Sequence, residues 1–253
     1  MSEVVFNYIG KNFIVVGASS GMGKQTAMEL AQAGAHVLAI ARSDKRLSSL
    51  QAIAPNLIDT AVIDVTTASD EQWEQTIRLF IEKYGKIDGA VYTAGTTGTT
   101  PLRLHDGADA RNIMETGFWG AMKCLEIVTK KKYSKEGSSF VVFSSTAAYL
   151  GGKGMLVYSG TKAAVQAAVH SVAKEIAGRK LRINSISPGW VKTEMTGNYL
   201  DHMGQSSQEI EDGCFGKGNP EDVTGMVLFL LSNRARWITG VDFIVDGGFM
   251  YGK

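Results

Sequence analysis

Short apolar runs alternate with amphipathic stretches along almost the whole chain. The runs are rich in β-branched residues and are bounded by Gly, Ser, Asp or Asn, which is typical of buried strands. We predict strands over residues 13–16, 37–40, 57–63, 87–92, 140–143, 181–186 and 241–245. The helical spacing of apolar residues between them predicts helices over residues 24–33, 45–52, 71–84, 111–131, 158–177 and 221–231.

The order of these elements determines the fold class that we expect. Strands that alternate with helices pair in parallel and carry helices on both faces of the sheet. No linker, repeat or low-complexity tract divides the chain, so we predict one α/β domain over residues 1–253, with a doubly wound parallel sheet of about seven strands. The long irregular stretch at residues 194–219 is expected to be a substrate loop, because compact domains rarely contain such loops without a function.

Charge and cysteine content exclude several classes of protein. Lys and Arg number 26 against 25 Asp and Glu, which gives no electrostatic reason to expect nucleic acid or an anionic membrane as partner. The aliphatic run at residues 226–231 is far shorter than the roughly 20 residues of a membrane span, and no secretory signal is visible. Cys124 and Cys214 cannot form a disulfide framework, and the four histidines suggest no metal site. We therefore expect a soluble, cytoplasmic protein without a metal.

A glycine cluster follows the first predicted strand and opens the first predicted helix. Residues 17–23 read Gly-Ala-Ser-Ser-Gly-Met-Gly. Glycines let the backbone turn tightly and approach a pyrophosphate, which then binds free amides at the positive end of the helix. The spacing G-x-x-x-G-x-G differs from the usual dinucleotide fingerprint, and such a cluster can also be a tight turn alone. Its place after the first strand of an α/β pattern favours nucleotide binding.

Tyr158 and Lys162 lie four positions apart in a predicted helix, so both side chains share one helix face. A free tyrosine has a pKa of about 10, too high for ready proton exchange at neutral pH. A neighbouring cation favours the phenolate and lowers that pKa, which makes Tyr158 a usable acid and base. A Tyr–Lys pair at this spacing also occurs by chance in many helices.

Ser144 and Ser145 follow the fifth predicted strand. Ligands of open α/β sheets bind beyond the carboxyl ends of the strands, so these hydroxyls are expected to face the binding crevice. The alternative is that they cap the following turn.

Together these motifs resemble the short-chain dehydrogenase/reductase family, in which Ser145 would stand thirteen positions before Tyr158 and Lys162 four after it. Nearly the whole chain follows the family pattern. Further matching residues, in family order, are Asp64, Ala94, Gly95, Asn184, Pro188, Gly189, Asp246, Gly247 and Gly248. The resemblance implies a Rossmann-type fold and hydride transfer between a nicotinamide and a carbonyl or secondary alcohol carbon.

The resemblance also implies a catalytic role for each residue of the motif. Ser145 would hydrogen-bond the substrate oxygen, and Tyr158 would protonate it during reduction. Lys162 would hold the nicotinamide ribose hydroxyls and lower the pKa of Tyr158, helped by the positive nicotinamide of the oxidised cofactor. Thr193 matches the position that bonds the carboxamide, and Trp190 would wall the substrate side or simply pack.

The implied cofactor contacts are Gly17, Ser19, Ser20, Gly21, Met22, Gly23, Arg42, Ser43, Asp64, Val65, Ala94, Gly95, Tyr158, Lys162, Pro188, Gly189, Val191 and Thr193. Asp64 would accept the adenine amino group, with Val65 beside the ring. The family position at the end of the second strand, where an acid selects NAD, is Ala41 here and is followed by Arg42. Arg42 can hold a 2′-phosphate by a charge-assisted hydrogen bond, with Ser43 close by, so we predict NADP(H) as the cofactor.

Two departures from the family pattern stand out. Tyr92 and Thr93 replace a pair of asparagines, although the Thr93 hydroxyl can still bond the backbone. Gly117 replaces an asparagine whose backbone carbonyl holds a water in the proton relay to the lysine, and Gly120 follows, so we expect a locally bent or open helix.

Three explanations of these glycines remain open: a relay preserved through the main chain, a site widened for a bulkier substrate, or close packing of Phe118 and Trp119 against a neighbouring subunit. The preserved relay is favoured, and it predicts that an asparagine at position 117 is tolerated.

The most consistent function is an NADPH-dependent carbonyl reductase similar to 3-oxoacyl-acyl-carrier-protein reductases. The alternatives are a sugar, polyol or steroid-type alcohol dehydrogenase and a non-catalytic nucleotide-binding redox sensor. The basic segment at residues 130–132, with Lys174, either complements a helix dipole or docks an acidic acyl carrier protein. Family members are commonly homotetramers, which the helices predicted at residues 111–131 and 158–177 would assemble.

Overall fold

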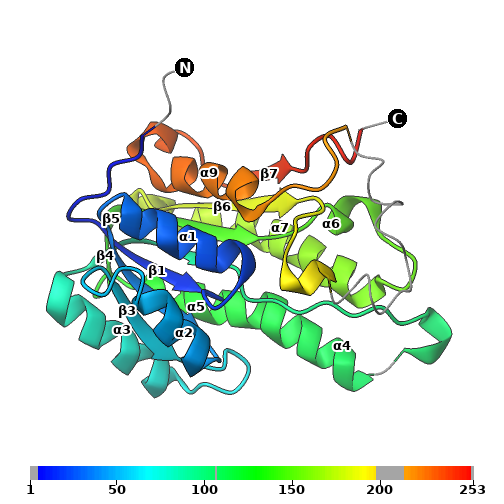
Figure 1. The fold of residues 1–253 in the computed structure, drawn as a ribbon, viewed down its shortest axis with the longest axis horizontal. Coiled ribbons are helices and arrows are strands. Elements are labelled where there is room, and N and C mark those ends of the chain that lie inside the picture. The colour runs from blue at the N-terminus through cyan, green and yellow to red at the C-terminus, as the bar shows by residue number, and fades with distance from the viewer. Residues whose placement is uncertain (1–4, 106, 198–213, 252–253) are drawn as a thin grey trace.

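Seven parallel strands form one sheet in the order β3-β2-β1-β4-β5-β6-β7 (Figure 1). The structure is a computed structural model that describes residues 5–105, 107–197 and 214–251. The strands are β1 Asn12–Val16, β2 His36–Ala41, β3 Ile58–Val62, β4 Ile87–Tyr92, β5 Ser134–Phe143, β6 Arg182–Pro188 and β7 Asp242–Val245. β1 pairs with both β2 and β4, so the strand order reverses there, and the predicted doubly wound sheet is confirmed.

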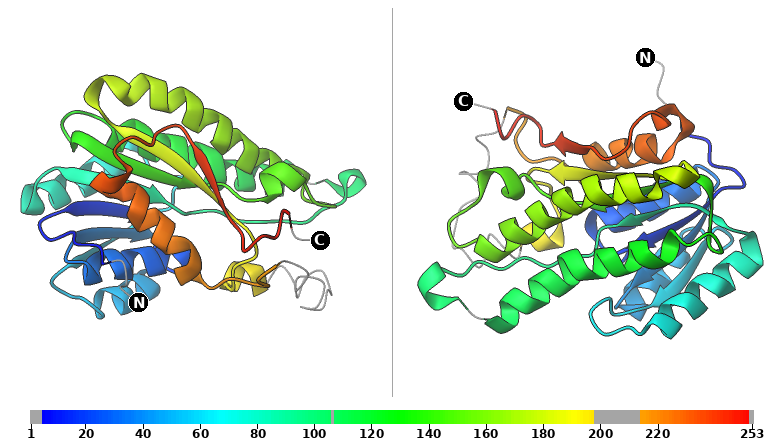
Figure 2. Two further views of the ribbon diagram at one scale, coloured as in Figure 1. Left: turned by 90° about the horizontal axis from the view of Figure 1, so that it is seen from above. Right: turned by 180° about the vertical axis from the view of Figure 1, so that it is seen from behind.

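Helices cover both faces of this sheet. They are α1 Gly21–Gln32, α2 Asp44–Gln51, α3 Asp70–Tyr84, α4 Gly107–Met114, α5 Gly120–Val128, α6 Ala147–Leu150, α7 Leu156–Ile176 and α9 Pro220–Leu231. Figure 1 shows α1 in front of the sheet, and the rear view in Figure 2 shows α5 and α7 on the opposite face. Within the described ranges, none of the helices combines the length and apolar character that crossing a bilayer requires.

The central strand shows why the apolar runs are continuous. Phe13 and Val15 pack into the cluster formed with α1, α2 and α9, whereas Ile14 and Val16 pack into the cluster formed with α3, α5 and α7. Successive side chains of a strand point to opposite faces, so a strand covered on both faces needs apolar residues at every position. This packing fixes the carboxyl ends of the strands, from which the site is built.

Several predicted boundaries were wrong for identifiable reasons. β5 begins at Ser134 rather than residue 140, because its polar first half, with an irregularity opposite β4 between Ile87 and Gly89, carries no apolar signal. The stretch predicted as irregular from residue 194 is helical over residues 194–197. The middle of that predicted loop, residues 198–213, lies outside the described residues.

The helix predicted over residues 111–131 is interrupted by a π-helical turn, Glu115–Trp119, between α4 and α5. The buried Tyr92 hydroxyl donates a hydrogen bond to the Thr116 carbonyl at 2.6 Å. A Cβ atom at Gly120 would lie within 3.0 Å of the same hydroxyl, so this position accepts no side chain without displacement. The two departures at Tyr92 and Gly117–Gly120 are therefore parts of one local arrangement, and the expected open helix is confirmed as a π turn.

We predict that Gly120→Ala lowers the free energy of unfolding by about 1–3 kcal/mol, because the new methyl group overpacks against Tyr92. Tyr92→Phe should cost a similar amount by leaving the buried Thr116 carbonyl without its donor. In the Tyr92→Phe background the hydroxyl contact is gone while the approaches to Val65 Cγ2 at 3.1 Å and the Glu115 carbonyl at 3.2 Å remain, so Gly120→Ala should cost less than in the parent. Denaturant unfolding of the four proteins at one concentration measures this cycle, and strictly additive losses would contradict it.

Candidate active site

A crevice of about 230 Å³ opens where the carboxyl ends of β1, β2, β3 and β4 meet. That edge of the sheet, at the reversal of strand order, is where α/β folds bind ligands. Among its lining residues are these predicted cofactor contacts: Gly17, Ser19, Ser20, Gly21, Met22, Gly23, Arg42, Asp64, Val65, Ala94, Gly95 and Thr193. The structure thus brings together residues from both halves of the chain.

The glycine turn between β1 and α1 is built for a close approach of the backbone. Gly17 has φ of 87°, and a Cβ atom on it would lie 2.6 Å from the Ala94 backbone nitrogen. Gly21, with φ of 52°, begins α1 and faces Thr193. A pyrophosphate can therefore reach the amino-terminal turn of α1 without meeting side chains at these positions. The residues fit a dinucleotide.

The second and third strands supply the polar groups at the far end of the crevice. Arg42 follows β2, and Asp64 follows β3. Asp64 Oδ1 accepts hydrogen bonds from the backbone nitrogen of Thr66 at 3.0 Å and from its hydroxyl at 2.7 Å. These bonds lower the pKa of Asp64, with a smaller contribution from the charge of Arg42. Asp64 is thus a fixed anionic acceptor, suited to an amino group of a base.

Not every predicted contact lines this crevice in the described part of the chain. Ser43 instead caps α2, where its hydroxyl accepts a hydrogen bond from the Arg46 backbone nitrogen at 3.4 Å. Gly189 lies beside the Asp246 turn and lines a neighbouring cavity. Pro188 ends β6, and the buried Val191 packs into the core cluster under α9, so both support the crevice from below.

That neighbouring cavity has a volume of about 260 Å³ and contains Ser145 and Tyr158. Both residues line this cavity. Burial raises the pKa of Tyr158, and the neighbouring Ser145 hydroxyl opposes that rise without cancelling it. Desolvation is the largest effect on this pKa in the free protein, and the lowering of the Tyr158 pKa by Lys162 together with an oxidised cofactor stays a prediction. At neutral pH, Tyr158 therefore carries its proton and can donate it.

Lys162 lies behind Tyr158, one helical turn further along α7. Its ammonium group donates a hydrogen bond to the Phe143 carbonyl at 2.8 Å and lies 5.7 Å from the centre of the Tyr158 ring. Burial lowers the pKa of Lys162 to about 8. The position of a Cβ atom on Gly95 is 3.7 Å from the same nitrogen, so Lys162 connects Tyr158 with the cofactor crevice.

The two neighbouring serines have different roles. Ser144 is buried, and its hydroxyl donates to the Lys162 carbonyl at 2.9 Å, which ties the end of β5 to α7. The Ser145 hydroxyl accepts from the Ala147 backbone nitrogen at 3.2 Å and faces the cavity. Both sequence interpretations thus apply to Ser145, which faces the cavity and bonds the following turn, and neither applies to Ser144.

Gly117 lies in the π turn and packs against α7. A Cβ atom at this position would lie 2.7 Å from Cγ2 of Thr161, the residue directly before Lys162. An asparagine at position 117 therefore has to displace the Thr161 methyl group, which argues against the expectation that it is tolerated. The exposed Trp119 packs edge-to-face on Phe118 at 4.9 Å, so packing of these rings is a second feature of the same turn.

Sequence reasoning missed several residues that line the cavities. Met195 borders the crevice, the Tyr158 cavity and a third cavity of about 540 Å³ that also contains Arg46 and Glu194. Arg46 and Glu194 form an ion pair across 148 positions, which no local sequence signal could have revealed.

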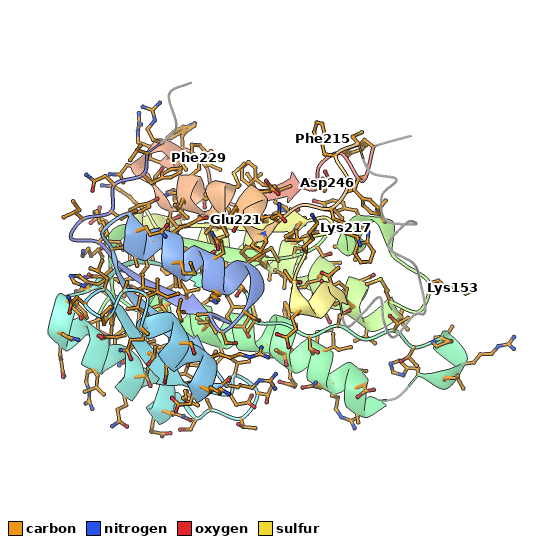
Figure 3. All side chains as sticks on the ribbon, in the orientation of Figure 1. Lys153, Phe215, Lys217, Glu221, Phe229 and Asp246 are labelled. Carbon is orange, nitrogen blue, oxygen red and sulfur yellow. The ribbon has the colours of Figure 1, made fainter. Side chains whose placement is uncertain are left out.

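Phe249, near the end of the chain, also lines the Tyr158 cavity and packs edge-to-face against Trp190 at 6.3 Å. The turn before it is held by Asp246, which accepts hydrogen bonds from the backbone nitrogens of Gly248 and Met250. Figure 3 shows Asp246 beyond the end of β7 with Phe215 nearby, and Phe215 bonds the same turn through the Gly247 carbonyl. The glycines after Asp246 were the only sequence signal for this turn.

Comparison with known proteins covers the same span. A family model described as enoyl-(acyl carrier protein) reductase matches residues 17–250. The chain is 32% identical over 245 residues to a 3-oxoacyl-(acyl-carrier-protein) reductase of Thermotoga maritima, covering 95% of this chain and 98% of that protein. It is 31% identical over 240 residues to a protein of the same name from Synechocystis sp., covering 94% and 96% of the two chains.

Solved structures agree with this result. A short-chain type dehydrogenase/reductase from Mycobacterium ulcerans superposes with a TM-score of 0.89 at 28% identity, over 98% of this chain and 92% of that one. A short-chain dehydrogenase/reductase from Brucella melitensis, named glucose/ribitol dehydrogenase, gives 0.89 at 26% identity, over 97% and 99%. Because sequence and structural relatives both span nearly the whole chain, this protein belongs to the short-chain dehydrogenase/reductase family and is an oxidoreductase of that family.

Proposed function

We propose that this protein is an NADPH-dependent reductase of ketoacyl-type carbonyl substrates, formed by a single domain. One observation carries the proposal: Ser145 and a protonated Tyr158 line the same cavity beside the cofactor crevice. The relatives named 3-oxoacyl-(acyl-carrier-protein) reductases support the substrate class. A pure redox sensor has no chemical need for Ser145, Tyr158 and Lys162 together, so that alternative is disfavoured.

In this proposal Ser145 and Tyr158 act on the substrate oxygen, and Lys162 acts on Tyr158 and on the cofactor ribose. When bound, the nicotinamide supplies a hydride to the carbonyl carbon. Ser145 donates a hydrogen bond to the carbonyl oxygen, and Tyr158 transfers its proton to that oxygen as negative charge develops there. Lys162 holds the ribose hydroxyls of the cofactor. It also stabilises the resulting phenolate, because its ammonium group lies 5.7 Å from the centre of the Tyr158 ring.

The wall of the Tyr158 cavity favours an apolar substrate. Its larger side chains are Leu150, Met155, Trp190, Met195 and Phe249, and none of its described lining residues carries a charge. A sugar or polyol needs many hydrogen-bond partners, whereas the polar side-chain groups of this wall are mostly hydroxyls, and those of Thr146 and Thr196 already bond backbone carbonyls. A steroid-type ketone shares the apolar chemistry and remains the second candidate.

An acyl carrier protein is the proposed carrier of the substrate, but the basic segment at residues 130–132 does not support docking there. Lys130 and Lys132 both pair with Glu74, at 3.0 and 2.9 Å, and these bonds lower the pKa of Glu74 to about 2. Assembly as a homotetramer through α4, α5 and α7 is likewise a proposal, supported by the exposed Trp119 and Leu156 side chains on these helices. We also propose that the protein is located in the cytoplasm.

The function is tested by NADPH oxidation with a panel of a 3-oxoacyl thioester, a steroid ketone and a keto sugar. We expect the thioester to be reduced fastest. Tyr158→Phe keeps the ring but removes the proton donor, so turnover should fall at least about a hundredfold with cofactor affinity retained. Preference for the sugar would contradict the substrate class, and near-parental turnover of Tyr158→Phe would show that the proton comes from elsewhere.

Cofactor preference is expected to depend on Arg42. The parent should bind NADPH roughly tenfold to over a hundredfold more tightly than NADH, the range for a hydrogen bond to a charged group. Arg42→Gln should remove most of that difference by weakening NADPH alone. Fluorescence titration with both reduced cofactors measures it, and equal or tighter binding of NADH by the parent would refute the preference.

Gly117→Asn is expected to lower turnover more than about tenfold, because displacement of Thr161 also displaces Lys162. Thr161→Ser removes the clashing methyl group and keeps the hydroxyl, so the double variant should recover most of the lost activity. Thr161→Ser alone is the matched control and should retain parental turnover. Parental turnover of Gly117→Asn alone would show that this contact does not constrain the site.

A further inference from the structure

Arg46 and Glu194 form a bidentate ion pair at the border between two cavities. Arg46 Nη1 donates to Glu194 Oε2 at 2.8 Å, and Nη2 donates to Oε1 at 2.9 Å. Arg46 lines both the cofactor crevice and the 540 Å³ cavity, whereas Glu194 lines only the latter. The pair therefore joins the first turn of α2 to the segment that follows β6.

The segment that carries Glu194 passes over the glycine turn. Thr193 lies against Gly21, with 3.2 Å between its methyl group and the position of a Cβ atom on Gly21. Met195 borders all three cavities. In Figure 1 the yellow turn after β6 lies beside the amino-terminal end of α1, in agreement with this contact. Arg46, which lies where the adenosine part of a dinucleotide is expected, thus bonds this segment to α2 in the free protein.

Two arginines and several carboxylates line this border. Arg42 and Arg46 both line the crevice, and Glu194 is bonded to Arg46. Asp64 of the crevice is bonded to Thr66 instead, and Asp109 lines the larger cavity. The hydrogen bond and charge of Arg46 lower the pKa of Glu194, so the carboxylate stays ionised at neutral pH. Side chains of the pair are 49% and 52% exposed, and ion pairs of this kind contribute little stability. A ligand phosphate with nearly two negative charges is a stronger partner for the same guanidinium.

We propose that Arg46 is a second residue, beside Arg42, that binds the 2′-phosphate of NADP(H), and that Glu194 occupies Arg46 until the phosphate displaces it. The exchange replaces one ion pair by another, and no covalent bond changes. The released Glu194 carboxylate returns to solvent. This inference rests on the proposed preference for NADP(H).

The experiment compares adenosine 2′,5′-bisphosphate with adenosine 5′-monophosphate by calorimetry on the full chain, at fixed ionic strength. Arg46→Gln should weaken the bisphosphate about tenfold or more and leave the monophosphate unchanged. Glu194→Gln should tighten the bisphosphate about twofold to fivefold, because the competing carboxylate is gone. Arg78→Gln, which removes an exposed arginine paired with Glu82 on α3, is the matched control and should change neither ligand. Melting temperatures check that each variant is folded.

The double variant Arg46→Gln/Glu194→Gln distinguishes exchange from simple repulsion. If Glu194 acts by holding Arg46, its removal gains nothing once Arg46 is absent, and an equal gain would overturn the exchange. Unchanged bisphosphate affinity in Arg46→Gln, together with a loss in Arg42→Gln, would overturn this inference but leave the NADP(H) preference intact. A parent that does not distinguish the two nucleotides would refute both.

Discussion

The site depends on the pairing of β1 with β2 on one side and β4 on the other. Because the chain winds away from β1 in opposite directions, the loops after β1 and β4 separate and leave a crevice between them. Gly17 and Ala94 come from those two loops. They lie so close that a Cβ atom on Gly17 would be 2.6 Å from the Ala94 backbone nitrogen. The Thr93 hydroxyl, bonded to the Val16 carbonyl at 2.9 Å, closes the sheet directly below them, as the sequence predicted. The crevice is thus as rigid as the buried core that holds these strands.

Glycines, which carry no side chain, also permit the close contact between α7 and the π turn that joins α4 to α5. Gly117 lets the π turn approach Thr161, and Gly120 leaves room for the Tyr92 hydroxyl that bonds the freed Thr116 carbonyl. A π turn leaves a backbone carbonyl without its usual helical partner, so a buried one requires a donor from elsewhere. Tyr92 supplies that donor from the end of β4. Tyr92 therefore links β4, which borders the crevice, to the turn that packs against α7.

These examples show which features the sequence could reveal. Continuous apolar runs identified the strands because both faces of the sheet are covered. The glycine turn and Ser145 closely follow two of those strands, and the spacing of Tyr158 and Lys162 placed both on one helix, α7. The polar first half of β5 and the helical residues 194–197 had no such signal. Arg46 and Glu194 meet only because α2 and the segment after β6 fold onto the same crevice. Contacts between distant segments, and the space that Thr161 takes beside Gly117, depend on packing that residue spacing does not encode.

Burial sets the protonation states of Tyr158 and Lys162 in the free protein. Desolvation disfavours the charged form of both groups, so it raises the pKa of Tyr158 and lowers the pKa of Lys162 to about 8. At neutral pH the resting pair is consequently a neutral phenol beside an ammonium group. A phenol is the form that donates a proton during carbonyl reduction, whereas alcohol oxidation requires the phenolate. Burial of this pair therefore favours the protonated form of Tyr158, which is the form that the proposed carbonyl reduction uses.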